Sequence, residues 1–243
     1  MNKEKTQSIK PISKLNAIIV FFIFGFVLYG NTLFNDFALD DSIAIKQNVF
    51  TNQGVEGIDD IFRYDSFVGF WLNSYKNKTA EEIQNEKKLV AGGRYRPLSF
   101  ALFALERDVF GKDPFVHHLF NIIYYVLTAI VLYLFLLRLF PENTKFSWLS
   151  LPFIAVLIFM AHPVHTEVVA NIKGRDEILS LLGTLLAALS YIKYIEKRKI
   201  KYLFAGFFAM FLALLSKENA ITWLAVIPVS VLFFKEKNIK KHI

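Results

Sequence analysis

The chain has 243 residues, a formal net charge of +7 and a mean hydropathy of +0.39, with 54% hydrophobic and only 20% charged residues. A soluble domain of this length would carry more charge and fewer long apolar runs, so the composition predicts an all-α polytopic membrane protein. The sequence contains no cysteine. This excludes disulfides, Cys-based zinc sites and thiol nucleophiles, and it fits a bacterial envelope protein. We expect the lipid bilayer, and no nucleic acid, as a partner.

Six apolar runs approach the length of a membrane span. They cover residues 15–34, 119–137, 148–161, 178–192, 202–215 and 220–234. The first run is bulky throughout and lacks the small residues of a cleavage site, so we interpret it as a retained span rather than a signal peptide. The sequence shows no internal repeat, and residues 1–243 are expected to form a single membrane domain.

Basic residues indicate the orientation of these spans. If the N-terminus is cytoplasmic, the inner segments carry fifteen Lys and Arg residues and the short outer loops only three. This is the asymmetry of the positive-inside rule. Residues 35–118 then form one large outer loop, and 162–177 and 216–219 also face outward. We expect the active face to be periplasmic or extracellular, at a bacterial plasma membrane, or luminal if the protein is eukaryotic.

Within the large loop, residues 57–72 look amphipathic and are expected to lie along the membrane surface. Residues 76–88 are polar and predict a mobile or solvated helix. Residues 98–105 are apolar but too short to span a membrane.

Asp40 and Asp41 follow the first predicted span. Adjacent carboxylates between apolar residues resist ionising together, so one of them is expected to have a raised pKa suited to base catalysis or metal binding. The alternative is a surface turn or a helix N-cap before residues 42–46.

The most charged loop between two apolar runs covers residues 162–177. It carries His162, His165 and Glu167, then Lys173, Arg175, Asp176 and Glu177. The His and Glu spacing does not match the helical zinc motif His-Glu-x-x-His. The fourth span begins near Arg175 on the outer side, and a helix N-terminus with a guanidinium suits a phosphate. The alternative is that Arg175 pairs with Asp176 or Glu177.

Similar groups begin the second and sixth spans. Lys217 is a second candidate phosphate ligand, with a simple Lys217–Glu218 pair as the alternative. His118 and Asn121 enter the second span, and Arg94 and Arg96 come from the large loop. An acidic base with a cationic clamp suits transfer from a phosphate leaving group. A transporter would need charges near the middle of the membrane, where these spans have almost none.

Six short motifs in order, covering nearly the whole chain, resemble one known family. They are Leu39-Asp40-Asp41-Ser42-Ile43-Ala44-Ile45-Lys46-Gln47-Asn48, Tyr95-Arg96-Pro97-Leu98-Ser99, Phe115-Val116-His117-His118-Leu119-Phe120-Asn121, His162-Pro163-Val164-His165-Thr166-Glu167-Val168-Val169-Ala170-Asn171, Gly174-Arg175-Asp176-Glu177 and Leu215-Ser216-Lys217-Glu218-Asn219. The ordered set resembles the transmembrane and tetratricopeptide-repeat protein O-mannosyltransferases of the glycosyltransferase C superfamily.

The resemblance implies a glycosyltransferase C-like membrane domain with about six spans and a large first outer loop bearing the catalytic acid. It implies an inverting, mannosyltransferase-like enzyme that moves a sugar from a polyprenyl- or dolichyl-phosphate donor to a hydroxyl acceptor, a protein Ser/Thr or a glycan. The family usually has further spans and C-terminal tetratricopeptide repeats, which these 243 residues lack. We therefore expect the N-terminal membrane part of a longer protein.

The resemblance also implies roles for individual residues. Asp40 or Asp41 orients or deprotonates the acceptor, and donor phosphate-binding falls to Arg96, His165, Arg175 and Lys217. Supporting roles fall to His118, Asn121, His162, Glu167, Asp176, Glu177 and Glu218. A divalent cation, Mg²⁺ or Mn²⁺, would bind at Asp40 and Asp41 if one is used. The alternative function is a non-catalytic lipid-phosphate-binding scaffold or a transporter subunit.

Overall fold

The computed structural model describes residues 13–75, 77–86, 94–140 and 150–239, with side chains up to 234. All regular elements in these ranges are helical. The first helix, α1 (Lys14–Tyr29), begins where the Ser13 side chain accepts a hydrogen bond from the backbone N–H of Asn16, 3.1 Å away. Such a cap satisfies one of the free N–H groups of a helix start. A 3-10 turn, η1 (Gly30–Phe34), prolongs α1.

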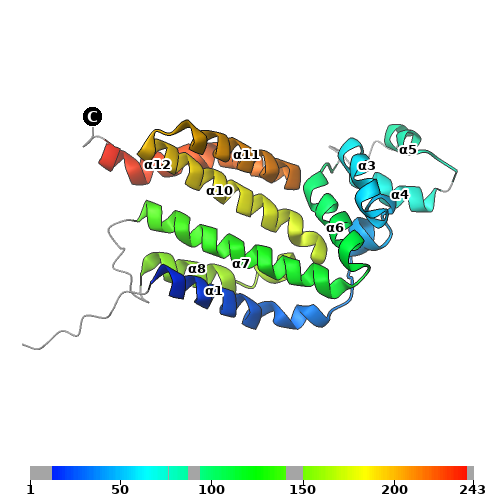
Figure 1. Cartoon of the computed structure of the whole chain (residues 1–243), viewed down its shortest axis with the longest axis horizontal. Helices are drawn as coiled ribbons and strands as arrows, with labels where there is room; N and C mark the ends of the chain where they lie inside the picture. The colour runs from blue at the N-terminus through cyan, green and yellow to red at the C-terminus, as the bar shows by residue number, and fades with distance from the viewer. Residues whose placement is uncertain (1–12, 76, 87–93, 141–149, 240–243) are drawn as a thin grey trace, which may run out of the picture.

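Six long helices form a bundle (Figure 1). Besides α1 they are α7 (Pro114–Leu139), α8 (Leu151–Ala161), α10 (Arg175–Lys197), α11 (Ile200–Ser216) and α12 (Trp223–Ile239). In the figure α7 runs through the middle, with α1 and α8 on one side and α10, α11 and α12 on the other. We call the end of the bundle beside α3–α6 the loop end; α1 begins and α12 ends at the opposite end.

Each of the six predicted spans overlaps one of these helices, but the helices differ in length. Three segments are long and apolar enough to cross a membrane: Lys14–Phe34, Pro114–Leu139 and Ile172–Lys197. The segments Leu151–Ala161, Ile200–Ser216 and Glu218–Phe234 are apolar but shorter. The predicted third span included Trp148, which lies outside the described residues, as do the topology-setting Lys3, Lys5, Lys10, Lys145, Lys240 and Lys241.

The segment between α1 and α7 folds into a cluster of short helices, which we call the loop region. Its elements are η2 (Ser42–Lys46), α2 (Val49–Asn52), η3 (Gly54–Gly57), α3 (Ile58–Arg63), α4 (Val68–Ser74), α5 (Ala80–Glu86) and α6 (Pro97–Phe110). Buried side chains from η2, α2, α3 and α6 give this region its own core, and Ile172, from the turn before α10, completes it.

Residues 57–72 form two helices, because α3 ends at Arg63 and α4 begins at Val68, where the Asp65 carboxylate accepts from the Phe67 N–H and turns the chain. The described part of residues 76–88 contains α5, most of whose residues are exposed, as expected for a solvated helix. Ile83, at 1% exposed, packs this helix on the loop region. The apolar residues 98–105 lie within α6, as part of that core.

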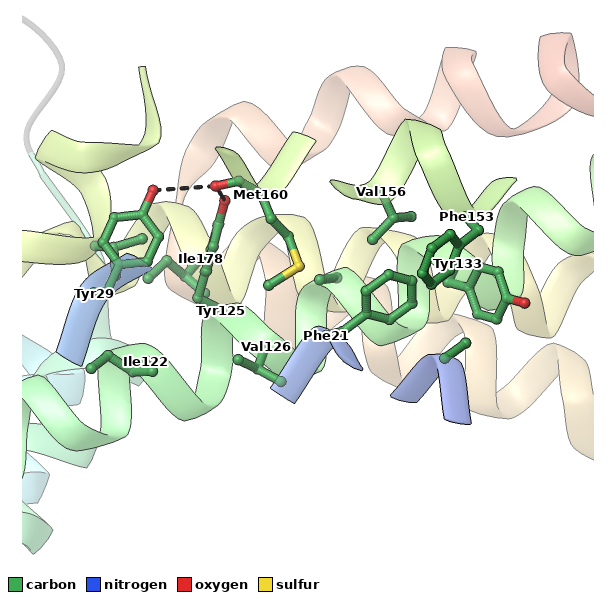
Figure 2. Close-up of a cluster of buried hydrophobic side chains, with 13 residues drawn as sticks. Phe21, Tyr29, Ile122, Tyr125, Val126, Tyr133, Phe153, Val156, Met160 and Ile178 are labelled. Carbon is green, nitrogen blue, oxygen red and sulfur yellow. Dashed lines mark hydrogen bonds between the residues drawn. The ribbon is translucent and has the colours of Figure 1, made fainter. Parts of the chain in front are cut away.

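Aromatic packing joins α1, α7 and α8 (Figure 2). The Phe21 ring lies 5.2 Å from Tyr133 and 5.3 Å from Phe153 between ring centroids. Closer to the loop end, the Tyr125 hydroxyl donates to the Met160 carbonyl at 3.1 Å. Such aromatic contacts bury large apolar areas and satisfy the hydroxyl. They fix the last turn of α8, and with it the start of the histidine-containing loop.

Candidate functional site

Asp41 ties the loop region to the start of α10. Its side chain is fully buried, with Oδ1 accepting from the Lys173 backbone N–H at 2.8 Å and Oδ2 from the Ala38 N–H at 3.0 Å. Burial raises the pKa of the Asp41 carboxyl, although these backbone hydrogen bonds oppose the rise. Asp41 precedes η2 but makes no side-chain cap there. The member of the acidic pair with the raised pKa is therefore Asp41, whose carboxylate anchors the loop region to the chain entering α10.

Asp40 differs from its neighbour in exposure. About half of its side chain is exposed (51%), and its Oδ2 lies 4.0 Å from the Lys173 Nζ. The residue before it, Leu39, has a left-handed backbone with φ +44° and an exposed side chain. Non-glycine residues rarely adopt this conformation, and they do so mainly where the surrounding structure enforces it. The turn thus holds Asp41 inward while Asp40 keeps contact with solvent.

A group of paired charges, which we call the charged junction, lies beside Asp40. It joins the start of α6, the turn η5 (Ile172–Gly174), the first turn of α10 and the turn η6 (Glu218–Thr222). Its members are Arg96, Lys173, Asp176, Glu177, Lys217 and Glu218.

Arg96 is the centre of this junction. Its Nη1 lies 2.6 Å from Asp176 Oδ2, and its Nη2 and Nε lie 2.6 and 3.1 Å from the two carboxylate oxygens of Glu218. Lys173 Nζ approaches the same Asp176 oxygen at 3.3 Å. The other oxygen of Asp176 is buried without a hydrogen-bond partner among the described residues. Asp176 and Glu218 thus hold the predicted phosphate ligand Arg96 in place.

Lys217 and Glu177 form a second ion pair at the junction. The Asn219 amide also donates to Glu177, at 3.1 Å, and its oxygen accepts from the Ser180 hydroxyl at 3.0 Å. The expected alternative, a Lys217–Glu218 pair, is wrong, because Glu218 bonds Arg96 instead. Sequence neighbours at the end of a helix point in different directions, which separates the two.

Arg175 begins α10, as the sequence predicts, but its side chain points into the protein. Its side chain is fully buried, and Nη1 pairs with Glu106 while Nε donates to Asn121 Oδ1 at 2.8 Å and Nη2 to the His117 carbonyl at 2.9 Å. The guanidinium also lies over the Phe103 ring, 4.4 Å from its centroid. Arg175 has no exposed atoms for a donor phosphate, and it pairs with neither Asp176 nor Glu177. Its contacts join α10 to α6 and α7.

Asn121 and His118, two of the predicted supporting residues, are also buried. The Asn121 amide donates to the carbonyls of Val169, Asn171 and Ile172, at 3.1 to 3.4 Å, and so holds the chain entering α10. His118 is 1% exposed within α7. Sequence reasoning assigned no role to Glu106 and named His117 only within a motif; in the structure Glu106 Oε2 and His117 Nδ1 lie 2.6 Å apart. The polar Glu106 at the end of an apolar run was the available signal for this pair.

The histidine loop lines a cavity of about 350 Å³ next to the junction. His165 begins α9 (His165–Ala170) and faces this cavity, with Glu177 and Asn219 also at its wall. Burial, and then the nearby His162, lower the pKa of His165, which favours the neutral imidazole at pH 7. His162 and Glu167 are exposed and lie outside the hydrogen-bonded junction. The other walls are mostly apolar and come from α7, α8, α10 and α12.

Close packing of the backbone holds this loop in place. A Cβ on Gly174 would lie 2.2 Å from the carbonyl oxygen of Val168, so only glycine fits between α9 and α10. Each oxygen of Asp41 already accepts one backbone hydrogen bond, whereas Asp40 has an exposed carboxylate. Across the described ranges, no three His, Asp or Glu side chains come together as metal ligands.

Membrane-length helices with an acid and paired cations at one end define a multi-span membrane protein with a polar site at the bilayer edge. The family model for dolichyl-phosphate-mannose-protein mannosyltransferases matches residues 96–243. The chain belongs to this family, which confirms the resemblance described above.

Named relatives agree with this assignment. Human protein O-mannosyl-transferase TMTC1 is 32% identical over 215 residues, covering 84% of this chain and 22% of the relative. Human TMTC2 is 33% identical over 228 residues (89% and 24%), and the Caenorhabditis elegans protein O-mannosyl-transferase F38B6.6 is 28% identical over 229 residues (94% and 29%). The chain thus spans less than a third of the length of these relatives. No solved structure shows a significant match.

Proposed function

We propose that this chain carries the active site of a membrane mannosyltransferase. It moves a mannosyl group from a polyprenyl- or dolichyl-phosphate donor to a hydroxyl acceptor, a Ser or Thr of a protein. The observation that carries the proposal is the half-exposed Asp40 carboxylate beside Lys173, held there by the buried Asp41. An accessible acid next to a cation is the pair that glycosyl transfer from a phosphate needs.

The proposed reaction is a single displacement with inversion. Asp40 accepts the proton of the acceptor hydroxyl as its oxygen forms a bond to the anomeric carbon. The bond from that carbon to the phosphate oxygen breaks, and the electron pair leaves with the lipid phosphate. Asp41 takes no proton in this scheme, because both of its oxygens already accept backbone hydrogen bonds. Asp41 instead positions Asp40 through the turn at Leu39.

Lys217 and Lys173 are the proposed phosphate contacts. Their side chains are each 17% exposed, compared with 8% for Arg96, whose nitrogens are committed to two carboxylates. Glu177 is 37% exposed on the side chain, so it can turn to solvent while a phosphate takes its place on Lys217. Arg96 stays bound to Asp176 and Glu218 and does not touch the donor.

The cavity at His165 supports a lipid-linked donor. Its walls combine apolar side chains from four helices with the polar Glu177 and Asn219 near the junction. An apolar pocket with a few polar groups at one end matches a molecule with a hydrocarbon tail and a charged head. Neutral His165 can offer one hydrogen bond to the phosphate or the sugar.

The basic residues favour a non-cytoplasmic site. Among the described residues, seven Lys and Arg side chains lie at the helix ends and short connections opposite the loop region: Lys14, Arg138, Lys193, Lys197, Arg198, Lys199 and Lys201. The short connections at the loop end carry three: Lys173, Arg175 and Lys217. By the positive-inside rule the end opposite the loop region faces the cytoplasm, with the N-terminus, and the loop end faces the periplasm, the cell exterior or the lumen.

Asparagine variants of the two aspartates test the proposal. Asp40→Asn is expected to reduce transfer from a polyprenyl-phosphate mannose donor by roughly 10²–10⁴-fold, the usual worth of a general base, with an unchanged melting temperature. Asp59→Asn, an exposed acid of the same loop region, is the matched control and should keep full activity. Full activity of Asp40→Asn in membranes containing the full-length protein would overturn the assignment.

Arg96, Lys173 and Lys217 of the charged junction are each paired with a carboxylate. This pairing favours a second candidate function, a non-catalytic scaffold that binds a lipid phosphate. A scaffold predicts that Lys217→Ala weakens binding of a polyprenyl phosphate while no transfer occurs in the unmutated protein. Transfer that depends on Asp40 would exclude the scaffold.

A further inference from the structure

A second cavity lies where the chain leaving η1 meets η2 and the turn between α6 and α7. Its volume is about 440 Å³. It shares no lining residue with the cavity at His165. The charged groups at its wall are Lys46, Arg107, Lys112 and Asp36.

The three cations come from three different elements. Lys46 ends η2, Arg107 lies in the last turn of α6, and Lys112 lies in the turn before α7. Within the described part of the chain, none of them lies within 4.0 Å of a carboxylate, in contrast to Arg96, Arg175, Lys173 and Lys217. Partial burial lowers the pKa of Arg107.

The acids near these three cations contact other parts of the chain. Asp113 Oδ1 accepts from the Phe115 N–H, 3.0 Å away, and caps α7. Asp108 packs against Gly54, where a Cβ would meet its carboxylate oxygen at 2.6 Å. Asp36 Oδ1 accepts from the Phe37 N–H at 2.7 Å. Three cations therefore face a cavity with one acid, an arrangement that favours an anion.

Exposed apolar side chains around the same turn indicate where the anion comes from. Val109, Phe110 and Phe115 are 71%, 51% and 39% exposed. They flank Lys112 at the start of α7, a helix long and apolar enough to cross a membrane. Aromatic and basic residues at the start of a span are typical of the headgroup layer of a bilayer.

We propose that this cavity binds the phosphate headgroup of an anionic phospholipid at the bilayer surface. Arg107, as a planar donor, and the two lysines contact the phosphate, while Val109 and Phe110 contact the acyl chains. The site is separate from the proposed transfer site. It holds the α6–α7 turn, and with it the loop region, against the membrane.

Lipid retention tests this proposal. The purified protein is placed in nanodiscs of mixed phosphatidylglycerol and phosphatidylcholine, and the lipids that stay bound are counted by native mass spectrometry. Arg107→Gln/Lys112→Gln is expected to lose the preference for phosphatidylglycerol about tenfold or more, since each interfacial cation contributes several-fold. Arg63→Gln is the matched control, because Arg63 also lies in the last turn of a helix of the loop region but pairs with Asp59.

Three outcomes decide the matter. Loss of phosphatidylglycerol preference in the double variant, with Arg63→Gln unchanged, supports the site. An equal preference in wild type and double variant overturns it. Stabilisation of the lipid-free protein in detergent by millimolar inorganic phosphate, without phosphatidylglycerol preference, also overturns it in favour of a free-phosphate site. If the double variant does not fold, Lys46→Gln at an exposed position gives the same comparison. Mannosyl transfer is not the readout, so failure here leaves the transfer proposal unaffected.

Discussion

Replacing Arg175 by alanine separates a structural role from a phosphate-binding role. The change removes the partner of Glu106, the hydrogen bond to Asn121 and the one to the His117 carbonyl, all at buried positions. Glu106 then keeps only His117 as a side-chain partner. Removing one member of a buried ion pair costs on the order of 3–5 kcal/mol. For a chain of this size that corresponds to a drop in melting temperature of roughly 10 °C. We therefore expect Arg175→Ala to lose activity because it unfolds more easily.

Two further variants sharpen this test. Arg175→Lys keeps the charge but cannot reach three acceptors at once, so it should lose most of the same stability. Glu106→Gln/Arg175→Met removes both charges and should be more stable than Arg175→Ala, because no unpaired ion is left. Melting is followed by differential scanning fluorimetry in detergent, in parallel with binding of a polyprenyl phosphate. An Arg175→Ala protein with wild-type melting but lost phosphate binding would refute the structural role.

Three other changes follow from the site. Gly174→Ala should destabilise the protein by about 2 kcal/mol or more, measured by thermal melting, because its Cβ meets the Val168 carbonyl. Burial raises the pKa of Asp41, so the folded protein holds a proton there more tightly than the unfolded chain does. The contribution of Asp41 to stability is therefore greatest below pH 4 and falls as the pH rises through the raised pKa. Asp41→Asn should remove this slope from a pH series of melting temperatures. Glu177→Gln frees Lys217 and should tighten polyprenyl-phosphate binding several-fold in a titration, whereas tighter binding would be absent if Lys217 is only structural.

The sequence predicts the helices well and the side-chain partners poorly. Apolar runs locate all six long helices because helix positions depend on local hydrophobicity. The burial of Arg175 depends on Glu106, which is 69 residues away in the chain and comes from α6. Arg96 and Glu218 are separated by 122 residues. No local pattern contains such pairings, so the sequence predicts which charges gather at the loop end but not which of them remain accessible.

The acidic pair shows the same limit on a smaller scale. Asp40 and Asp41 are adjacent and chemically equivalent in the sequence, so either fits the role of a base. Only the fold distinguishes them, since the turn at Leu39 exposes one carboxylate and buries the other. The sequence pattern therefore predicts that one of the two aspartates is the base, without indicating which.

Lys173 makes two contacts that a substitution can alter independently. Its backbone N–H holds Asp41, and its ammonium group lies between Asp40 and Asp176. The first contact survives every replacement except proline, which has no N–H. The cation beside the proposed base can therefore be shortened, neutralised or reversed without releasing the loop region from α10. Position 173 allows the electrostatics of the site to be varied against a constant scaffold.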